Sequence, residues 1–156
     1  MKITLRAGGI IRSGAERDLI DDYLKRANGL ARGTGFTSID EQQVDLRSAK
    51  SRADETKILL HGLSSSSKLV IFDERGKTPT SRQISKHISN WRNGGITQLI
   101  FVIGGADGFE PDDIPAGTTR WAFGPQTWPH KMVRVMAAEQ IYRALSILAG
   151  TPYHRD

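Results

Sequence analysis

The sequence predicts an α/β fold, in which a mainly parallel β-sheet carries helices on both faces. Two observations indicate this class. Along the 156 residues, short apolar runs alternate five times with stretches whose apolar residues recur at helical spacing. The two most apolar runs, 68–74 and 98–105, are continuous, as expected for strands buried on both faces of a parallel sheet. The length predicts a single domain, residues 1–156, that is large enough to bury a hydrophobic core.

The first half of the chain contains two predicted strand–helix units. The segment "KITLRA", residues 2–7, has the pattern of a short strand. A helix is expected over about 15–27, where apolar residues recur every three or four positions. "FTSIDEQQVD", residues 36–45, can supply a second strand, and "RADETKILLHGL", residues 52–63, a second helix.

The second half adds three predicted strands and two helices. The run at 68–74 precedes a helix that has Ile84 and Ile88 on one apolar stripe. This helix is expected to end at Gly94-Gly95, because glycine favours the backbone conformation that closes a helix. The run at 98–105 is the strongest strand signal, and "TRWAFG", residues 119–124, is a shorter one.

The last predicted helix, about 129–149, is apolar on nearly all sides. Pro129 suits its first turn and Gly150 its end. A helix of this kind is either the central helix of the core or packs against a second copy of itself. The sequence therefore raises the possibility of a homodimer.

The composition is typical of a cytoplasmic protein without metal or thiol chemistry. The net charge of +5 favours polyanionic partners such as nucleic acid. The absence of cysteine excludes disulfides, thiolate metal ligands and cysteine nucleophiles. None of the four histidines has a carboxylate at ligand spacing on one helix, and no G-x-S-x-G motif is present. We therefore expect no metal, and we expect neither a signal peptide nor a membrane span.

A glycine-rich segment follows the strongest strand, at the edge of the sheet where ligands of such folds bind. "IGGADGF", residues 103–109, has the spacing GGxxG, which differs from the dinucleotide and phosphate-loop fingerprints. Asp107 and Glu110 would also repel a diphosphate. The segment is either a ligand loop for a different cofactor or an ordinary strand-to-helix turn.

A second candidate segment joins the last strand to the last helix. In "FGPQTWPHKMVR", residues 123–134, Phe123 and Trp128 either flank a flat ring or belong to the core. His130 and Arg134 are four residues apart at a helix start and therefore share a face. The chain then ends in "GTPYHRD", which is either a frayed end or part of a site.

Three segments together resemble one enzyme family. "VIGGADGF" is similar to the family's IGGxxG loop, "FGPQTWPHKMVRVMAAEQIYRA" to its loop-and-helix signature, and "PYHRD" to its Y-H-R or Y-H-K ending. The family is the RlmH (YbeA-type) large-subunit ribosomal RNA pseudouridine methyltransferases of the SPOUT superfamily. The resemblance spans the whole chain, and three matches in the right order are far more specific than one.

The resemblance implies a fold, an assembly and an activity. The C-terminal part of the α/β domain would form a deep trefoil knot, a rare exception among protein chains. The protein would be a homodimer packed largely through the knotted region, with S-adenosylmethionine as cofactor. It would methylate N3 of a pseudouridine in the large-subunit ribosomal RNA (23S), with the assembled ribosome as substrate.

The resemblance also implies the residues of the site. The cofactor would be bound by Phe72, Gly104, Gly105, Phe123, Gly124, Pro125, Gln126, Thr127 and Trp128. Position 72 departs from the family, in which leucine is commoner, and the middle of "FGPQTW" varies among members. In the tail, Tyr153 would stack on the target base, His154 would orient the base or help to remove its N3 proton, and Arg155 would contact the RNA.

Arg134 is expected to face the same site. Glu139 is well placed to pair with Arg143, four residues further along the helix, and out of register for Arg134, five residues before it. Two other functions stay open. A non-catalytic module that binds ribosomal RNA would have degraded cofactor loops or no tail, and a nucleotide-binding protein of the flavodoxin or Rossmann type would have a different glycine pattern.

Overall fold

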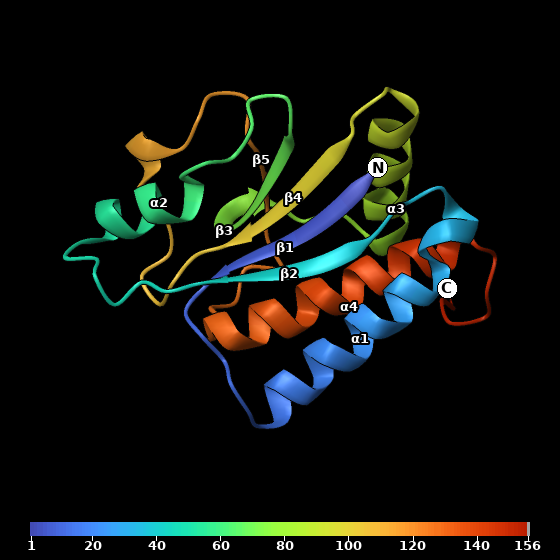
Figure 1. Ribbon diagram of the computed structural model, residues 1–156, viewed down its shortest axis with the longest axis horizontal. Coiled ribbons are helices and arrows are strands. Elements are labelled where there is room, and N and C mark those ends of the chain that lie inside the picture. The colour runs from blue at the N-terminus through green and yellow to red at the C-terminus, as the bar shows by residue number, and fades with distance from the viewer. Residues whose placement is uncertain (156) are drawn as a thin grey trace.

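The computed structural model describes residues 1–155 and contains one five-stranded sheet in which all strands are parallel (Figure 1). The strand order is β2-β1-β4-β3-β5, so β1 and β4 lie in the middle. The strands are β1 (Lys2–Gly8), β2 (Ile39–Val44), β3 (Lys68–Lys77), β4 (Gln98–Ile103) and β5 (Thr119–Trp121). Because all strands are parallel, their carboxyl ends meet at one edge, where the candidate loops follow β3, β4 and β5.

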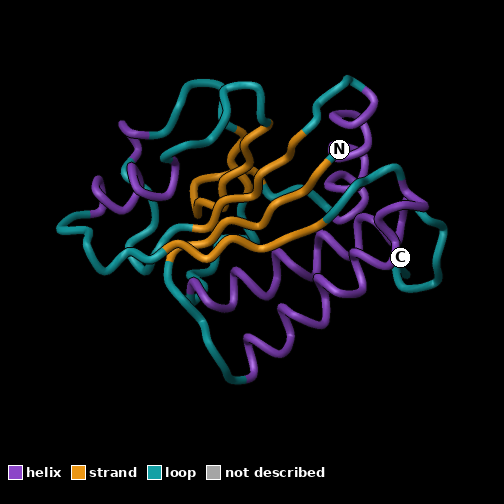
Figure 2. The backbone as a smooth tube through the Cα atoms, in the orientation of Figure 1, coloured by secondary structure: helices purple, strands orange, loops and turns teal. Residues whose placement is uncertain are grey.

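Helices cover both faces of the sheet, as the sequence predicts (Figure 2). The elements are α1 (Ala15–Ala31), α2 (Arg52–Leu60), α3 (Ser81–Asn93) and α4 (His130–Leu148), with short 3-10 helices η1 (Arg32–Thr34) and η2 (Pro111–Asp113). One face carries α1, α3 and α4, and α4 contacts both of the other two helices. The opposite face carries α2 alone among the α-helices of the described chain.

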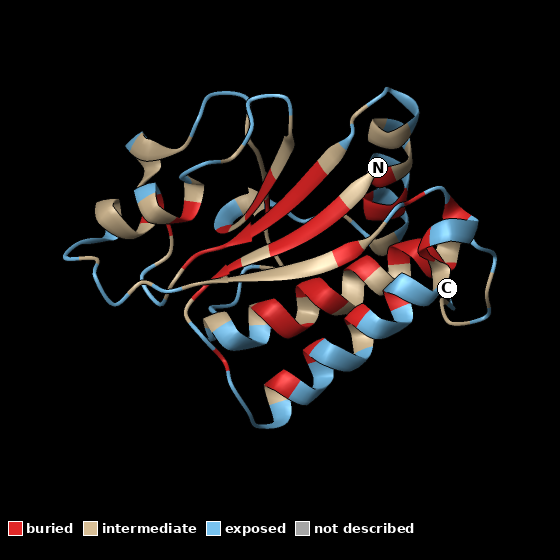
Figure 3. Ribbon diagram, viewed as in Figure 1, coloured by how far each residue is buried: buried red, intermediate tan, exposed pale blue. Residues whose placement is uncertain are grey.

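The two faces of the sheet contribute to two separate hydrophobic clusters. Figure 3 shows how far the central strands are buried between the helices. The larger cluster contains Leu5, Leu99 and Phe101 from the strands, packed against apolar side chains of α1, α3 and α4. The smaller cluster contains Ile71, Ile100 and the α2 residue Leu59, together with other side chains of the second face. Strand residues alternate between the clusters, and this explains why residues 69–72 of β3 and 99–103 of β4 are continuously apolar.

Local chemistry accounts for the helix ends. Thr80 and Gln83 form a reciprocal capping box at the start of α3. Gly95 takes a positive φ of 85° just beyond its end, at the predicted stop. The first helix is longer than predicted, since α1 continues from Ala27 to Ala31. Asn28 stabilises this extra turn through its side chain, which accepts from the backbone of Ile39 and donates to its carbonyl.

The last helix is largely internal to the protomer. Eight residues of α4, including Ala138, Ile141 and Leu145, are buried within the single chain. Contacts with the sheet, α1 and α3 therefore explain most of its apolar surface, although Met132 is 37% exposed. The predicted dimer and the predicted knot stay predictions.

No helix within residues 1–155 is both long and apolar enough to cross a bilayer. The same residues contain no group of three or more histidine, aspartate or glutamate side chains that could hold a metal ion.

Candidate active site

A cavity of about 280 Å³ lies at the carboxyl edge of the sheet. Three segments far apart in the sequence form it, together with one residue from α2 and two from α4. Its lining consists of residues 72–75, 103–109, 121–124 and 126–128, with Arg52, His130 and Val133. Eight of the nine predicted cofactor residues are in this lining, and Pro125 lies in the same loop but outside it.

An aromatic pair forms one wall of the cavity. The rings of Phe72 and Phe123 are stacked, with centroids 4.7 Å apart and planes 10° from parallel. Phe72 lies in β3 directly after the buried Ile71, and Phe123 follows β5, the strand that pairs with β3. Such a pair offers a flat apolar surface to a ring-shaped ligand.

The glycine-rich loop after β4 is tightly packed against itself and against α2. A Cβ on Gly104 would lie 3.0 Å from the backbone of Gly108, and one on Gly105 would lie 2.5 Å from the Glu55 carboxylate. Gly108 alone of these three glycines has a positive φ, of 71°. Gly104 therefore permits the close approach of the Gly108 backbone, Gly105 leaves room for the Glu55 side chain, and Gly108 permits the turn. Burial of Glu55, and next the nearby Asp107, raise the pKa of the Glu55 carboxyl.

The loop from Gly124 to Trp128 closes another side of the cavity. Gly124 has a φ of 107°, a conformation that other residues rarely adopt. The indole Nε1 of Trp128 donates to the Phe123 carbonyl at 3.3 Å, while the side chain stays partly exposed. His130, the first residue of α4, follows this loop. Burial, and next the positive charge of Arg134, lower the pKa of His130, so its ring is neutral at pH 7.

Sequence reasoning missed the charged groups of the cavity. Asp73, Glu74 and Arg75 line it from β3, and Arg52 lines it from α2. The carboxylate of Asp73 is 3% exposed and pairs with the Arg75 guanidinium. Arg52 pairs with Glu110 at 2.9 Å. Residues 73–75 follow the apolar part of the run at 68–74, and no motif in the sequence indicates how they fold.

The prediction that Arg134 faces the site is wrong. Arg134 is fully buried, and its Nη2 donates to the carbonyls of Gly8 and Gly9 at 2.7 and 2.9 Å. Its Nη1 donates to Gln43 at 3.2 Å and lies 3.5 Å from Glu41. The guanidinium thus joins α4 to the ends of β1 and β2. The predicted pairing of Glu139 with Arg143 is confirmed, because the two side chains form an ion pair at 2.5 Å.

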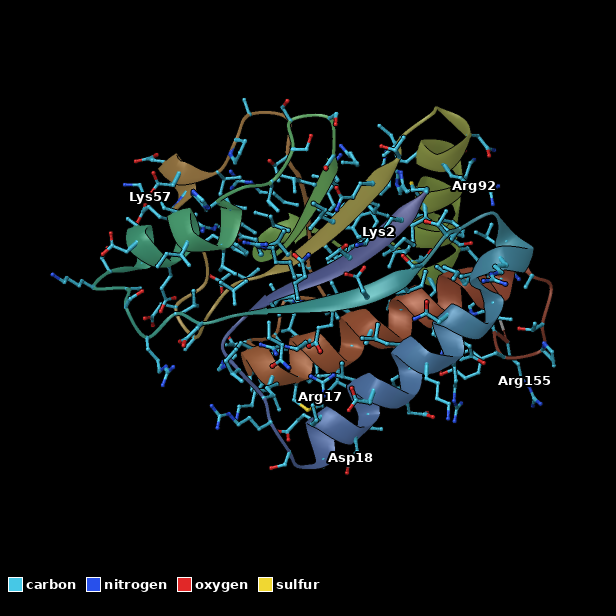
Figure 4. All side chains as sticks on the ribbon, viewed as in Figure 1. Lys2, Arg17, Asp18, Lys57, Arg92 and Arg155 are labelled. Carbon is cyan, nitrogen blue, oxygen red and sulfur yellow. The ribbon has the colours of Figure 1, made fainter. Side chains whose placement is uncertain are left out.

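The same buried network contains Arg17, which Figure 4 shows between α1 and α4. Arg17 pairs with Glu41 and with Asp21, in each case at 2.7 Å. Glu41 is therefore shared by two buried arginines from two helices. This carboxylate lies between two guanidinium groups at the junction of α1, α4 and β2, and removing it would leave uncompensated buried charge.

The tail does not reach the cavity of its own protomer. Tyr153 packs against Tyr142 with ring centroids 4.5 Å apart, and its hydroxyl donates to Glu139 at 3.0 Å. Nδ1 of His154 lies 3.3 Å from Arg143. Figure 4 shows Arg155 beyond the C-terminal part of α4, at the opposite end of the molecule from α2. The tail residues lie close to one another, but none of them is in the lining.

Comparisons with known proteins identify the family. A family model described as "Predicted SPOUT methyltransferase" matches residues 1–154. The chain is 48% identical over 156 residues to a "Ribosomal RNA large subunit methyltransferase H" of Maricaulis maris (strain MCS10), covering 100% of both chains. Proteins of the same name from Hyphomonas neptunium and Dinoroseobacter shibae are each 43% identical over 155 residues, with 99% of both chains covered. The chain belongs to the SPOUT methyltransferase family.

Proposed function

We propose that this protein transfers a methyl group from S-adenosylmethionine to N3 of a pseudouridine in large-subunit ribosomal RNA. The substrate would be the ribosome in the cytoplasm, and the enzyme would act as a homodimer. One observation carries the proposal: two segments that resemble the family's loops, 103–109 and 123–128, converge on one cavity together with Phe72 of β3. Full-length relatives that are named as large-subunit ribosomal RNA methyltransferases support it.

The residues of the cavity fit the cofactor. The stacked Phe72 and Phe123 suit the flat adenine ring. Glu74 and Asp107 line the cavity and favour a cationic ligand over a diphosphate. When bound, S-adenosylmethionine would supply a methyl group on a positively charged sulfur. The loops after β4 and β5 would hold its nucleoside part, and the neutral His130 would add no repulsion near the sulfonium.

The remaining work is to position the target base and to remove its N3 proton. Tyr153 is a poor candidate for the base, because its burial, and next its bond to Glu139, raise its pKa above the ordinary value. Its ring remains suitable for stacking on the target base. His154, the next residue, would orient the base or help to remove its N3 proton, because an imidazole can accept a proton. Arg155 would contact the RNA.

The position of the tail supports a shared site. The 19 residues of α4 span roughly 28 Å, and the tail begins at the end of this helix that is remote from the cavity. Tyr153 returns only as far as Glu139, in the middle of α4. A second protomer that packs against α4 would bring its own tail to the cavity of the first. We therefore propose that each site uses the loops of one subunit and the tail of its partner.

The first test is methyl transfer. Labelled S-adenosylmethionine is incubated with ribosomes that lack the modification, and the product is mapped by mass spectrometry. We expect the label on a pseudouridine of the large-subunit RNA. Cofactor binding without transfer to any RNA would overturn the proposal in favour of a non-catalytic binding module.

The second test addresses the shared site. One subunit carries Gly124→Val, which disrupts the cofactor loop, and the other lacks residues 153–156. Two affinity tags isolate mixed dimers of these inactive subunits. We expect activity to return in the mixed dimer, because one intact pocket then meets one intact tail. No recovery would show that the tail acts within its own subunit, and a stable monomer in sedimentation would contradict the dimer.

A further inference from the structure

We propose that Arg75, fixed by Asp73 at the mouth of the cavity, binds a phosphate of the RNA strand next to the target nucleotide. The inference rests on the proposed function and adds a substrate-positioning residue to it. It starts from an irregular segment of β3 that has no counterpart in the other described strands.

The pairing of β3 with β5 shifts its register between Phe72 and Lys77, within the strand. Both residues pair with Trp121 of β5, so the four residues between them form an excursion from the strand ladder. Gly76 allows this excursion to return to the sheet. A Cβ at Gly76 would lie 2.6 Å from the backbone N and C of Trp121, closer than any side chain tolerates. The close packing at Gly76 therefore fixes the position of the excursion. As a result, residues 73–75 line the cavity.

Within the excursion, Asp73 fixes the orientation of Arg75. Its carboxylate accepts from the Arg75 backbone N at 2.9 Å, from Nε at 3.1 Å and from Nη2 at 3.4 Å. Burial alone would raise the pKa of Asp73, but these bonds outweigh the burial and lower it. Asp73 thus remains charged, and the ion pair is permanent at physiological pH.

The guanidinium of Arg75 keeps donors for a ligand. Its side chain is 53% exposed, and within the described residues its Nη1 makes no hydrogen bond. An arginine that is oriented by one carboxylate and open on its far side suits a second anionic oxygen. Asp73 also neutralises most of its charge, which limits repulsion toward a sulfonium in the same cavity.

The RNA backbone is the anion that the geometry favours. An enzyme that acts on a base must take it out of the stack and insert it into a pocket, so the adjoining phosphates stay at the mouth. Arg75 lies at that mouth. The cofactor has a carboxylate of its own, which is the competing partner, and the experiment below separates the two.

The test compares Arg75→Ala with a matched control, Arg47→Ala. Arg47 forms the same two-residue turn with Asp45, yet lies outside the cavity lining. We expect Arg75→Ala to raise the KM for ribosomes about tenfold and to reduce its salt dependence by about one charge. The Kd for S-adenosylmethionine, measured by calorimetry, should stay unchanged, and that binding also shows that the variant is folded. Arg75→Lys should restore part of the loss.

Three results would overturn the inference. An equal weakening of cofactor binding would assign Arg75 to the cofactor carboxylate. An unchanged KM would remove any contact with RNA, and an equal effect of Arg47→Ala would reduce the effect to overall surface charge. Each result requires an active wild-type enzyme. A failure of the proposed function itself gives a different result: the wild-type protein then binds the cofactor but methylates no RNA.

Discussion

Two turns of this molecule have the same local chemistry and different surroundings. Asp45–Arg47 follows β2, and Asp73–Arg75 lies in β3. In both, the aspartate accepts from the arginine backbone N two residues later, at 3.0 Å in the first and 2.9 Å in the second. In each turn, the guanidinium Nε of the arginine also donates to the carboxylate of that turn's aspartate.

The difference between the turns is burial. The carboxylate of Asp45 is 44% exposed and that of Asp73 is 3% exposed. The bond from Arg47 lowers the pKa of Asp45 to about 2, whereas burial opposes the same bond at Asp73. The first turn is a surface feature. The second places a charged pair at the mouth of the cavity, so the surroundings give the second turn its functional position.

The largest expected effect comes from Gly76→Ala, which removes the excursion that distinguishes the second turn. The new Cβ would meet the Trp121 backbone, and overpacking of this kind costs about 1–3 kcal/mol. We expect a lower urea midpoint and weaker cofactor binding, measured by denaturation and calorimetry.

Gly29→Ala is the control for this substitution. It lies within α1, where a Cβ meets nothing within 4 Å, and replacing glycine inside a helix stabilises it by up to about 1 kcal/mol. If Gly76→Ala had the stability and cofactor affinity of the wild type, the excursion would not depend on this close approach.

A smaller effect is expected from neutralising each aspartate. Asp73→Asn keeps a side-chain oxygen that accepts from Arg75 but removes its charge, and we expect a loss of about 0.5–1.5 kcal/mol, the net contribution of one ordinary hydrogen bond. Asp45→Asn should leave the urea midpoint almost unchanged, because the pair is exposed. Equal midpoints for the two variants would show that burial of the turn does not matter for stability.

The smallest effect is the pH dependence of the exposed turn. In the folded protein the pKa of Asp45 is lowered to about 2. Its bond to Arg47 therefore stabilises the fold fully above about pH 4, the ordinary pKa of aspartate. This contribution is lost as the pH falls from there through the folded pKa. Carboxyl-carbon NMR should give a midpoint near 2, and Arg47→Ala should return it toward the ordinary value. A midpoint near 4 in the wild type would show that the bond is absent in solution.

Sequence patterns predicted most of the fold because they report burial locally. Continuous apolar runs predicted β3 and β4, and the cap at Gly94-Gly95 predicted the end of α3. Eight of the nine cofactor residues that the family resemblance implies also lie in the lining of one cavity. Each of these signals lies within a short segment or within a motif of fixed order.

Arg134 shows where such reasoning fails. Helical spacing correctly predicted that Arg134 does not pair with Glu139. However, two of the partners of Arg134 are backbone carbonyls, and one of these lies 126 residues earlier in the chain. A carbonyl carries no signal in the sequence. The sequence also did not predict that the Asp73–Arg75 turn lines the cavity. The Asp45–Arg47 turn has the same spacing and lies outside the cavity, so the spacing alone does not indicate a site.

By itself, the sequence determined the order and type of the elements, the edge of the sheet where the site forms, and the family. These properties depend on hydrophobic periodicity, on turn residues and on motifs, all of which act over a few neighbouring positions. Only the tertiary structure decided which charges are buried, which arginine faces the cavity and where the tail lies. Those outcomes depend on contacts between distant segments, whose free energy is set by packing and by the loss of water around charged groups.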